Sequence, residues 1–161
     1  MSTTDMFLKI DGIAGESADS KHKDEIDVLN WSWGASNSGS MSLGGGGGSG
    51  MVNMQDFNFT MYMSKASPVL MDYCARGEHI DKAVLTCRKA GGKPHEYLTL
   101  TFEKCMVSSY STGGGGSDTL PTENISLNFA KVTQNYYPQD DKGGAKGTVS
   151  KSYDLKSRTA A

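Results

Sequence analysis

Apolar and polar residues alternate along most of this chain, and a period of two predicts β-strands. The alternation covers residues 6–10, 25–34, 57–61, 82–88, 97–103 and 124–129, with a weaker seventh segment at 149–155. Glycine-rich stretches lie between several of these segments. Such a pattern favours an antiparallel sandwich or barrel. The sequence therefore predicts a mainly β fold.

The two tryptophans of the second segment predict which of its faces is buried. Leu29, Trp31 and Trp33 share one face, so Ser32 points the opposite way if the tryptophans enter the core. Small polar residues recur on the opposite faces of the predicted strands, namely Asn30, Ser32, Asn58, Thr60, Thr99, Thr101, Asn124, Ser126 and Asn128. Either these faces are simply solvated, or the sheet lines a space or packs on a neighbour.

One segment departs from the alternation and predicts a single short helix. Ser67 is suited to the N-cap, Pro68 to the first helical position, and Gly77 to the position just past the end. Four apolar residues fall on one side at helical spacing, namely Val69, Leu70, Tyr73 and Cys74. We expect this helix to pack on the β scaffold.

Residues 34–50 form a long stretch without a single charged side chain. Eight of these seventeen residues are glycine, and five glycines are consecutive at 44–48. Such a stretch is either a linker or a segment that lies against another protein. With 161 residues the chain predicts one domain spanning 1–161, so no second domain exists for it to link. A contact surface is therefore the better interpretation.

Composition excludes several classes of function. The net charge is −2 and the basic residues form no stripe, which argues against nucleic acid and membrane-surface binding. Three cysteines without close spacing predict no disulfide framework and a reducing compartment. No apolar signal-peptide region or membrane-spanning stretch is present in the sequence. We expect the protein to fold in the cytoplasm, so its export would require dedicated machinery.

No motif for catalysis or for a cofactor withstands inspection. The glycine runs lack both the following helix of a dinucleotide site and the Gly-Lys-Ser/Thr ending of a phosphate loop. His22, His79 and His95 are isolated, which argues against zinc, and Ser32 lacks a nucleophile elbow and an evident His/Asp partner. The sequence predicts no metal, no cofactor and no enzymatic activity.

Several segments together resemble the Hcp (haemolysin-coregulated protein) tube proteins of bacterial type VI secretion systems. They are EIDVLNWSWGASNSGSMSLGGGGGSGMVNMQDFNFT, DMFLKIDGIAGES, LTCRKAGGKPHEYLTLTF and VSSYSTGGGGSDTLPTENISLNFAKV. The resemblance covers essentially the whole chain in the right order and is weakest after Tyr137.

The resemblance implies an antiparallel two-sheet β-barrel with one short flanking α-helix and a long extended Gly-rich loop. It also implies a homo-hexameric ring, and rings that stack into a tube driven by sheath and spike proteins. The tube would be secreted without a signal peptide, and the lumen of each ring would carry small effector proteins. Neither nucleic acid nor membrane insertion is expected.

Particular residues follow from the resemblance. Ser32 and Asn30 would face the lumen. The inter-subunit loop would contain Ser38, Met41, Leu43, Gly44, Gly45, Gly46, Gly47, Gly48 and Met51. Gly91, Gly92 and Lys156 are candidates for ring-to-ring contact.

Two other functions remain open on the sequence. One is a phage-type tail tube subunit, which shares the same physics of ring and tube. The other is a small secreted β-barrel hydrolase with Ser32 as its nucleophile. Because the sequence ends at Ala161 with no appended domain, we expect a plain tube protein rather than an effector fusion.

Overall fold

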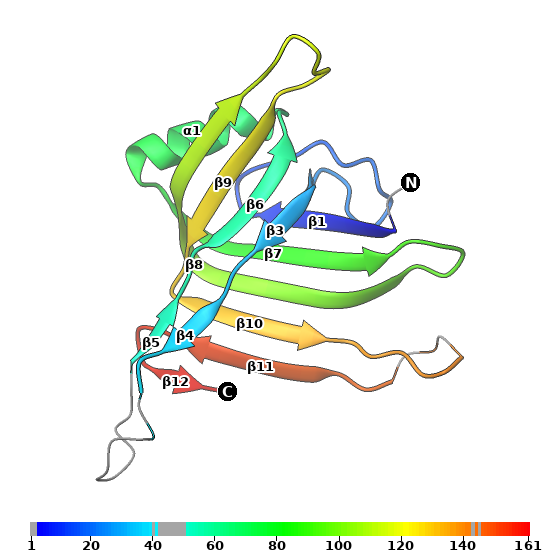
Figure 1. Ribbon diagram of the computed structural model, residues 1–161, viewed down its shortest axis with the longest axis vertical. Coiled ribbons are helices and arrows are strands. Elements are labelled where there is room, and N and C mark those ends of the chain that lie inside the picture. Colours follow the sequence, from blue (N-terminus) through cyan, green and yellow to red (C-terminus); the bar gives the residue numbers. More distant parts are fainter. Residues whose placement is uncertain (1–2, 40, 42–50, 143, 145) are drawn as a thin grey trace.

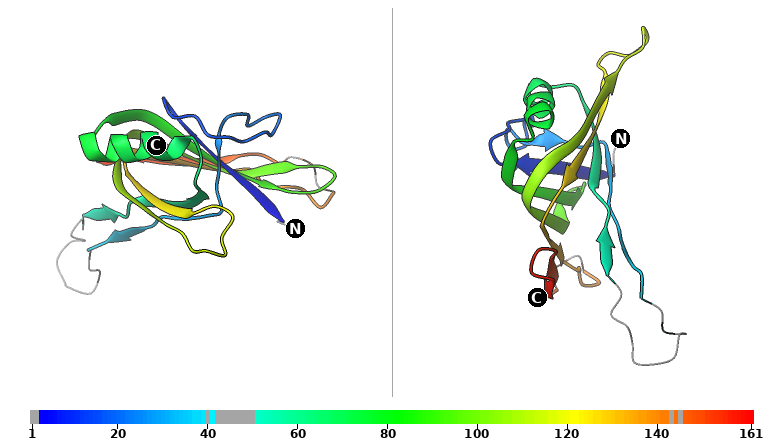
Figure 2. Two further views of the ribbon diagram at one scale, coloured as in Figure 1. Left: turned by 90° about the horizontal axis from the view of Figure 1, so that it is seen from above. Right: turned by 90° about the vertical axis from the view of Figure 1, so that its left-hand side faces the viewer.

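The computed structural model describes residues 3–39, 41, 51–142, 144 and 146–161, and it is mainly β with one helix (Figure 1). The strands form two layers that cross each other, and a two-stranded arm projects from them (Figures 1 and 2). Layer 1 has the order β12 (Thr159–Ala160), β11 (Val149–Asp154), β10 (Lys131–Tyr136), β8 (His95–Gly113), β7 (His79–Lys89), β1 (Thr4–Ile10) and β2 (Ile26–Asp27).

Layer 2 contains β3 (Asn30–Ser32), β6 (Phe57–Tyr62), β9 (Thr122–Asn128) and the last part of β8. The arm pairs β4 (Ala35–Asn37) with β5 (Val52–Met54), which continue β3 and β6. Helix α1 (Ala66–Arg76) packs against β8. All ladders in the described chain are antiparallel.

The chain passes between the layers at two places. Strand β8 pairs with β7 and β10 in its first part and with β9 in its last part, with an irregular register between Val107 and Ser109. Between β2 and β3, Val28 donates its N–H to Met6 O in layer 1, whereas Leu29 donates to Thr60 O in layer 2. The hydrogen-bonded ladder is interrupted at this crossing. The predicted fold class, mainly β in two antiparallel sheets with one short helix, is confirmed, although the sheets are two packed layers that do not close into a barrel.

The core lies between the layers and follows the predicted alternation. It is centred on aromatic rings, with Phe57 and Phe102 at a centroid distance of 4.7 Å and Trp33 edge-on to Phe129 at 6.4 Å. Phe59, Met61, Leu85, Leu100, Ile125 and Leu127 are buried around these rings. A strand with alternate side chains in this core leaves its intervening side chains on an outer face.

Two local predictions are wrong. Leu29 was expected on the buried face but is 40% exposed, while Val28 is buried, because the crossing at these residues breaks the alternation. Ser67 is not the N-cap but lies inside α1, where its hydroxyl accepts a hydrogen bond from Ser64 N–H. The predicted helix end is confirmed, since Gly77 is left-handed at φ 63°.

Within the described residues, no helix has both the length and the apolar character needed to cross a membrane.

Candidate functional site

The outer side of layer 2 is a surface of small polar side chains, which we call the polar face. Two cross-strand rows make up most of it. In register order, one row is Asn30, Thr60, Asn124 and Ser111, and the other is Ser32, Asn58, Ser126 and Ser109. None of these eight side chains is charged. The position of Ser32 on the exposed side confirms the predicted strand face, with Trp31 packed against the core.

Hydrogen bonds connect three neighbouring side chains in each row. Thr60 Oγ1 lies 2.9 Å from the Asn30 amide oxygen and 2.8 Å from that of Asn124. In the second row, Ser109 donates to Ser126 at 2.8 Å, and Ser126 donates in turn to Asn58. Polar groups that satisfy each other have fewer free donors and acceptors for a passing molecule. The polar face is therefore hydrophilic, but it offers few free hydrogen-bonding groups to a passing molecule.

A carboxylate marks one end of the polar face. Asp56 accepts hydrogen bonds from Ser108 Oγ at 2.6 Å and from Asn128 Nδ2 at 3.0 Å. These contacts fix the carboxylate at the point where β6 begins and β9 ends.

Both lateral edges of layer 2 lack a strand neighbour in the described chain. Strand β3 pairs with β6 and has no second ladder. The β7–β8 ladder ends at Met106, so the following part of β8, up to Gly113, pairs with β9 alone. Because each neighbouring pair in layer 2 is antiparallel, β3 runs antiparallel to β8. An uncharged edge of this kind is a template for another strand.

Layer 1 extends beyond layer 2 and leaves apolar side chains uncovered. The hairpin tips of β7–β8 and β10–β11 reach past layer 2 in two views (Figures 1 and 2). Leu98, Tyr136 and Val149 form one cross-strand row on the side of layer 1 that faces the core. Tyr136 is 47% exposed and Val149 is 59% exposed. We call this row the apolar shelf.

The arm carries no charge in its described residues, and most of them are exposed, although Val52 and Met54 are half-buried. Ser38 continues the β4–β5 pairing by donating its N–H to Met51 O at 3.3 Å. Met41 is 95% exposed and Met51 is 62% exposed. The expected loop residues Leu43, Gly44, Gly45, Gly46, Gly47 and Gly48 lie outside the described residues.

The three candidate stacking residues lie at opposite ends of layer 1. Gly91 and Gly92 are in the β7–β8 turn, just past the Lys89–His95 pair. Lys156 follows Asp154 of β11, which pairs with Lys131 of β10, and Lys131 pairs in turn with Glu103 of β8, far from the β7–β8 turn. The structure thus separates the glycines from the lysine by the length of the sheet.

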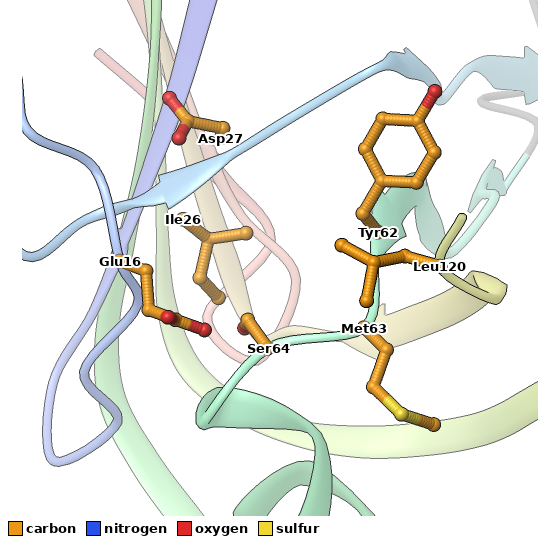
Figure 3. A pocket seen from close by; sticks show the side chains of 7 residues that line it. All are labelled: Glu16, Ile26, Asp27, Tyr62, Met63, Ser64 and Leu120. Carbon is orange, nitrogen blue, oxygen red and sulfur yellow. The ribbon is translucent and has the colours of Figure 1, made fainter.

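A hollow of about 220 Å³ lies near the start of α1 and is lined in part by Tyr62 at the end of β6 (Figure 3). Glu16 and Asp27 stand on one side of it, and Tyr62, Met63 and Leu120 stand on the other. Burial, with the nearby Asp19 and Asp5 carboxylates, raises the pKa of Asp27. Glu16 accepts a hydrogen bond from Lys65 N–H at 2.9 Å and so fixes the start of the helix.

The chemistry needed for nucleophilic catalysis is not assembled around Ser32. Its cross-strand neighbour is Asn58, and His22, His79 and His95 all lie on other elements. Among the thiols, Cys87 and Cys105 are buried, as expected for small core residues. Burial raises the pKa of Cys105 to about 12, which keeps the thiol protonated and unreactive.

Part of the polar face was missed by the sequence analysis. Ser109 and Ser111 were not assigned to a strand, because the irregular register after Val107 disturbs the period of two. The polar run Ser108–Ser109, followed by Tyr110 and Ser111, was a sequence signal that could have indicated this part of the polar face. The structure also brings Asp56, the residue just before the predicted strand 57–61, to this surface.

Known proteins match this chain along most of its length. A family model described as "Type VI secretion system effector, Hcp" matches residues 7–136. Protein hcp1 of Pseudomonas aeruginosa is 54% identical over 144 residues, covering 89% of each chain. A solved structure of a type six secretion system protein is 31% identical with a TM-score of 0.91, covering 98% of this chain and 99% of that one. For Hcp1 from Salmonella typhimurium, the identity is 38% and the TM-score 0.81, with 99% and 100% covered.

Proposed function

The chain belongs to the Hcp family and is a type VI secretion tube subunit, and from this premise we propose that six copies close into a ring lined by the polar face. Proteins of this family form ring oligomers. The observation that carries the proposal is a polar sheet face whose two rows carry no charge and whose two edges have no strand neighbour in the described chain. Such a face suits the inner wall of a channel.

The two edges of layer 2 are complementary to each other. Strand β3 of one copy can pair with the last part of β8 in the next copy, because the two run antiparallel within one chain. Repetition of this contact extends the four-stranded layer 2 from copy to copy. A head-to-tail contact that closes produces a ring, so no free edge remains.

The apolar shelf supports the same contact. It lies on the part of layer 1 that extends beyond layer 2, where Tyr136 and Val149 have no covering layer of their own. A second copy added alongside layer 2 covers this surface. Removal of apolar side chains from water supplies the main favourable free energy of association.

Ring stacking requires two further surfaces at opposite ends of the subunit. The Gly91–Gly92 turn and Lys156 occupy such opposite ends of layer 1. A contact between the two can repeat without closing and so produce a tube. The arm, with Ser38, Met41 and Met51, then lies against an adjacent copy, where its lack of charge reduces the cost of burial.

Export and cargo complete the proposal. Assembled rings leave the cell with sheath and spike proteins and without a signal peptide. Small effector proteins travel in the lumen, in contact with Ser32 and Asn30. A wall without charged side chains in its two rows is compatible with cargo of either sign. The protein acts as a carrier and not as an enzyme.

We expect Ser32→Gln to leave ring assembly unchanged and to weaken cargo retention. Ser32 is exposed on the polar face, so the longer side chain enters the lumen without disturbing the core. Loss of about 1 kcal/mol of contact free energy reduces retention about fivefold. Copurification of a co-expressed small effector measures retention, and light scattering after size exclusion measures the ring.

Ser150→Gln is the matched control, because Ser150 is exposed on layer 1, away from the polar face. It should change neither measurement. Loss of the ring in Ser32→Gln would contradict the placement of this residue. A wild-type protein that remains monomeric at high concentration would contradict the ring itself.

A further inference from the structure

The loop between β1 and β2 is attached to layer 1 through a buried histidine. His22 Nδ1 lies 3.0 Å from both carboxylate oxygens of Glu25, and Nε2 lies 2.7 Å from Glu96 Oε1. The imidazole stacks on Phe7 at 4.4 Å with an interplanar angle of 8°. Although Phe7 points away from layer 2, it is buried beneath this loop. His22 thus joins a loop to a strand that is 74 residues away in sequence.

An arginine makes a second attachment beside the first. Arg88 donates to Asp19 of the loop at 2.7 and 3.1 Å and to Asp5 of β1 at 3.0 Å. Its guanidinium lies 5.0 Å from the centroid of Phe7, on which His22 also stacks. We call the set of His22, Glu25, Glu96, Arg88 and Asp19 the clasp.

The clasp sits at the base of the β7–β8 hairpin. Arg88 and Glu96 are cross-strand partners, next to an irregular register between Cys87 and Arg88. The tip of this hairpin contains Gly91 and Gly92. The two strand residues of the clasp therefore hold the root of the turn that we propose for ring-to-ring contact.

Close backbone packing keeps the loop folded back on itself. Gly15 donates its N–H to Asp24 O at 2.7 Å, and a side chain at position 15 would overlap the Glu25 carbonyl group. The loop is therefore a fixed structural unit, and its position on the sheet is set by the clasp.

His22 is the member of the clasp whose charge changes near neutral pH. The groups that face this region are Asp19 and Glu25 of the loop, Asp5 of β1, Asp27 of β2, Glu96 of β8 and the cation Arg88 of β7. Five carboxylates therefore face one permanent cation. Among the described residues, the ion pairs of Glu25 and Glu96 are with His22, so a neutral His22 removes them.

The shift in the pKa of His22 agrees with this geometry. Burial lowers the pKa of His22, but the Glu96 and Glu25 carboxylates outweigh burial and raise it above 6.5 overall. Arg88 lowers the pKa of Asp19 to about 2, so this partner stays ionised throughout. A raised histidine pKa contributes stability below the unfolded value, and this stability is lost as pH rises through the folded value. The stability that protonated His22 contributes is therefore lost as the pH rises above 6.5.

We propose that the clasp is a pH-dependent latch on ring stacking: a protonated His22 fixes the β7–β8 hairpin for ring-to-ring contact, and a neutral His22 releases it. The stacking part of this inference rests on the proposed function. The latch itself rests on contacts within one chain.

Amide hydrogen exchange tests the latch without any assembly. After correction for intrinsic rates, protection of residues 14–25 and 89–96 should fall about fivefold between about pH 6 and about pH 8. His22→Gln should show the low protection at both values. His79→Gln is the matched control, since His79 is an exposed histidine at the far end of β7, and it should behave as wild type. Equal protection at both pH values in the wild type would overturn the latch.

Glu96→Gln provides a test that retains the histidine. Removing one of the two carboxylates should lower the midpoint of the His22 ring-proton titration by about one pH unit, a tenfold change in proton affinity. An unchanged midpoint would mean that Glu96 does not hold the proton. This variant decides the question even if His22→Gln fails to fold.

Sedimentation of tubes then tests the link to stacking. Wild-type tubes should be longer at about pH 6 than at about pH 8, and His22→Gln tubes should be short at both. If hydrogen exchange shows that the latch opens but the tubes have equal length at both pH values, the link between the latch and ring stacking is overturned. If the wild type forms no tubes at any pH, stacking fails as a proposed function, whereas hydrogen exchange still decides the latch.

Discussion

Tyr136→Lys is expected to convert the assembled ring into folded monomers. Tyr136 is half-exposed on the apolar shelf, which the proposed ring covers with a second copy. A lysine there places an unpaired charge in a desolvated contact, which costs about 3 kcal/mol, or about a hundredfold, at each interface. Light scattering after size exclusion should detect single 17.2 kDa chains, and circular dichroism should report an unchanged fold.

The control is Ser150→Lys, which places the same charge one residue beyond Val149 on the opposite face of β11. This variant should assemble as the wild type does. A Tyr136→Lys protein that still forms rings would show that the shelf is not part of the ring contact. Monomers from both variants would point instead to a general effect of added charge.

The second large effect is expected in the core, where Phe57→Ala should cost about 4 kcal/mol of unfolding free energy. Phe57 is fully buried and its ring lies 4.7 Å from Phe102, 5.8 Å from Phe59 and 6.4 Å from Trp31. Truncation leaves a cavity where the two layers meet. Urea unfolding measures the loss, at a fixed chain concentration because assembly shifts apparent stability.

Asn58→Ala is the matched control in the same strand. Asn58 lies next to Phe57 but points to the polar face, so its truncation should cost less than about 1 kcal/mol. If both variants lost the same free energy, the division of β6 into a core face and an outer face would be contradicted.

The sequence predicted those parts of the fold in which one buried face imposes a regular period. In β6, Phe57, Phe59 and Met61 alternate with polar residues and are buried as expected. The second part of β8 was missed, because its register changes after Val107 and its serines carry little β signal. Strand β10 was missed for a related reason, since Val132 is its one fully buried residue.

Some surface residues could be predicted from the sequence and others could not, for the same physical reason. Ser32 and Asn30 could be assigned to an outer face, since an alternating strand fixes the direction of each side chain. The clasp could not be foreseen. His22 and Glu96 looked like ordinary surface residues, and their 2.7 Å contact depends on how a loop folds over a distant strand. Local patterns carry no information about such pairs.

The long strand β8 has a mechanical consequence. Because one uninterrupted backbone segment belongs to both layers, a sliding force between them acts on covalent bonds as well as on side-chain packing. Strand β8 also connects the β7–β8 hairpin directly to layer 2. In the proposed tube, a load on this hairpin would therefore reach layer 2 through the covalent backbone of β8 as well as through side-chain packing.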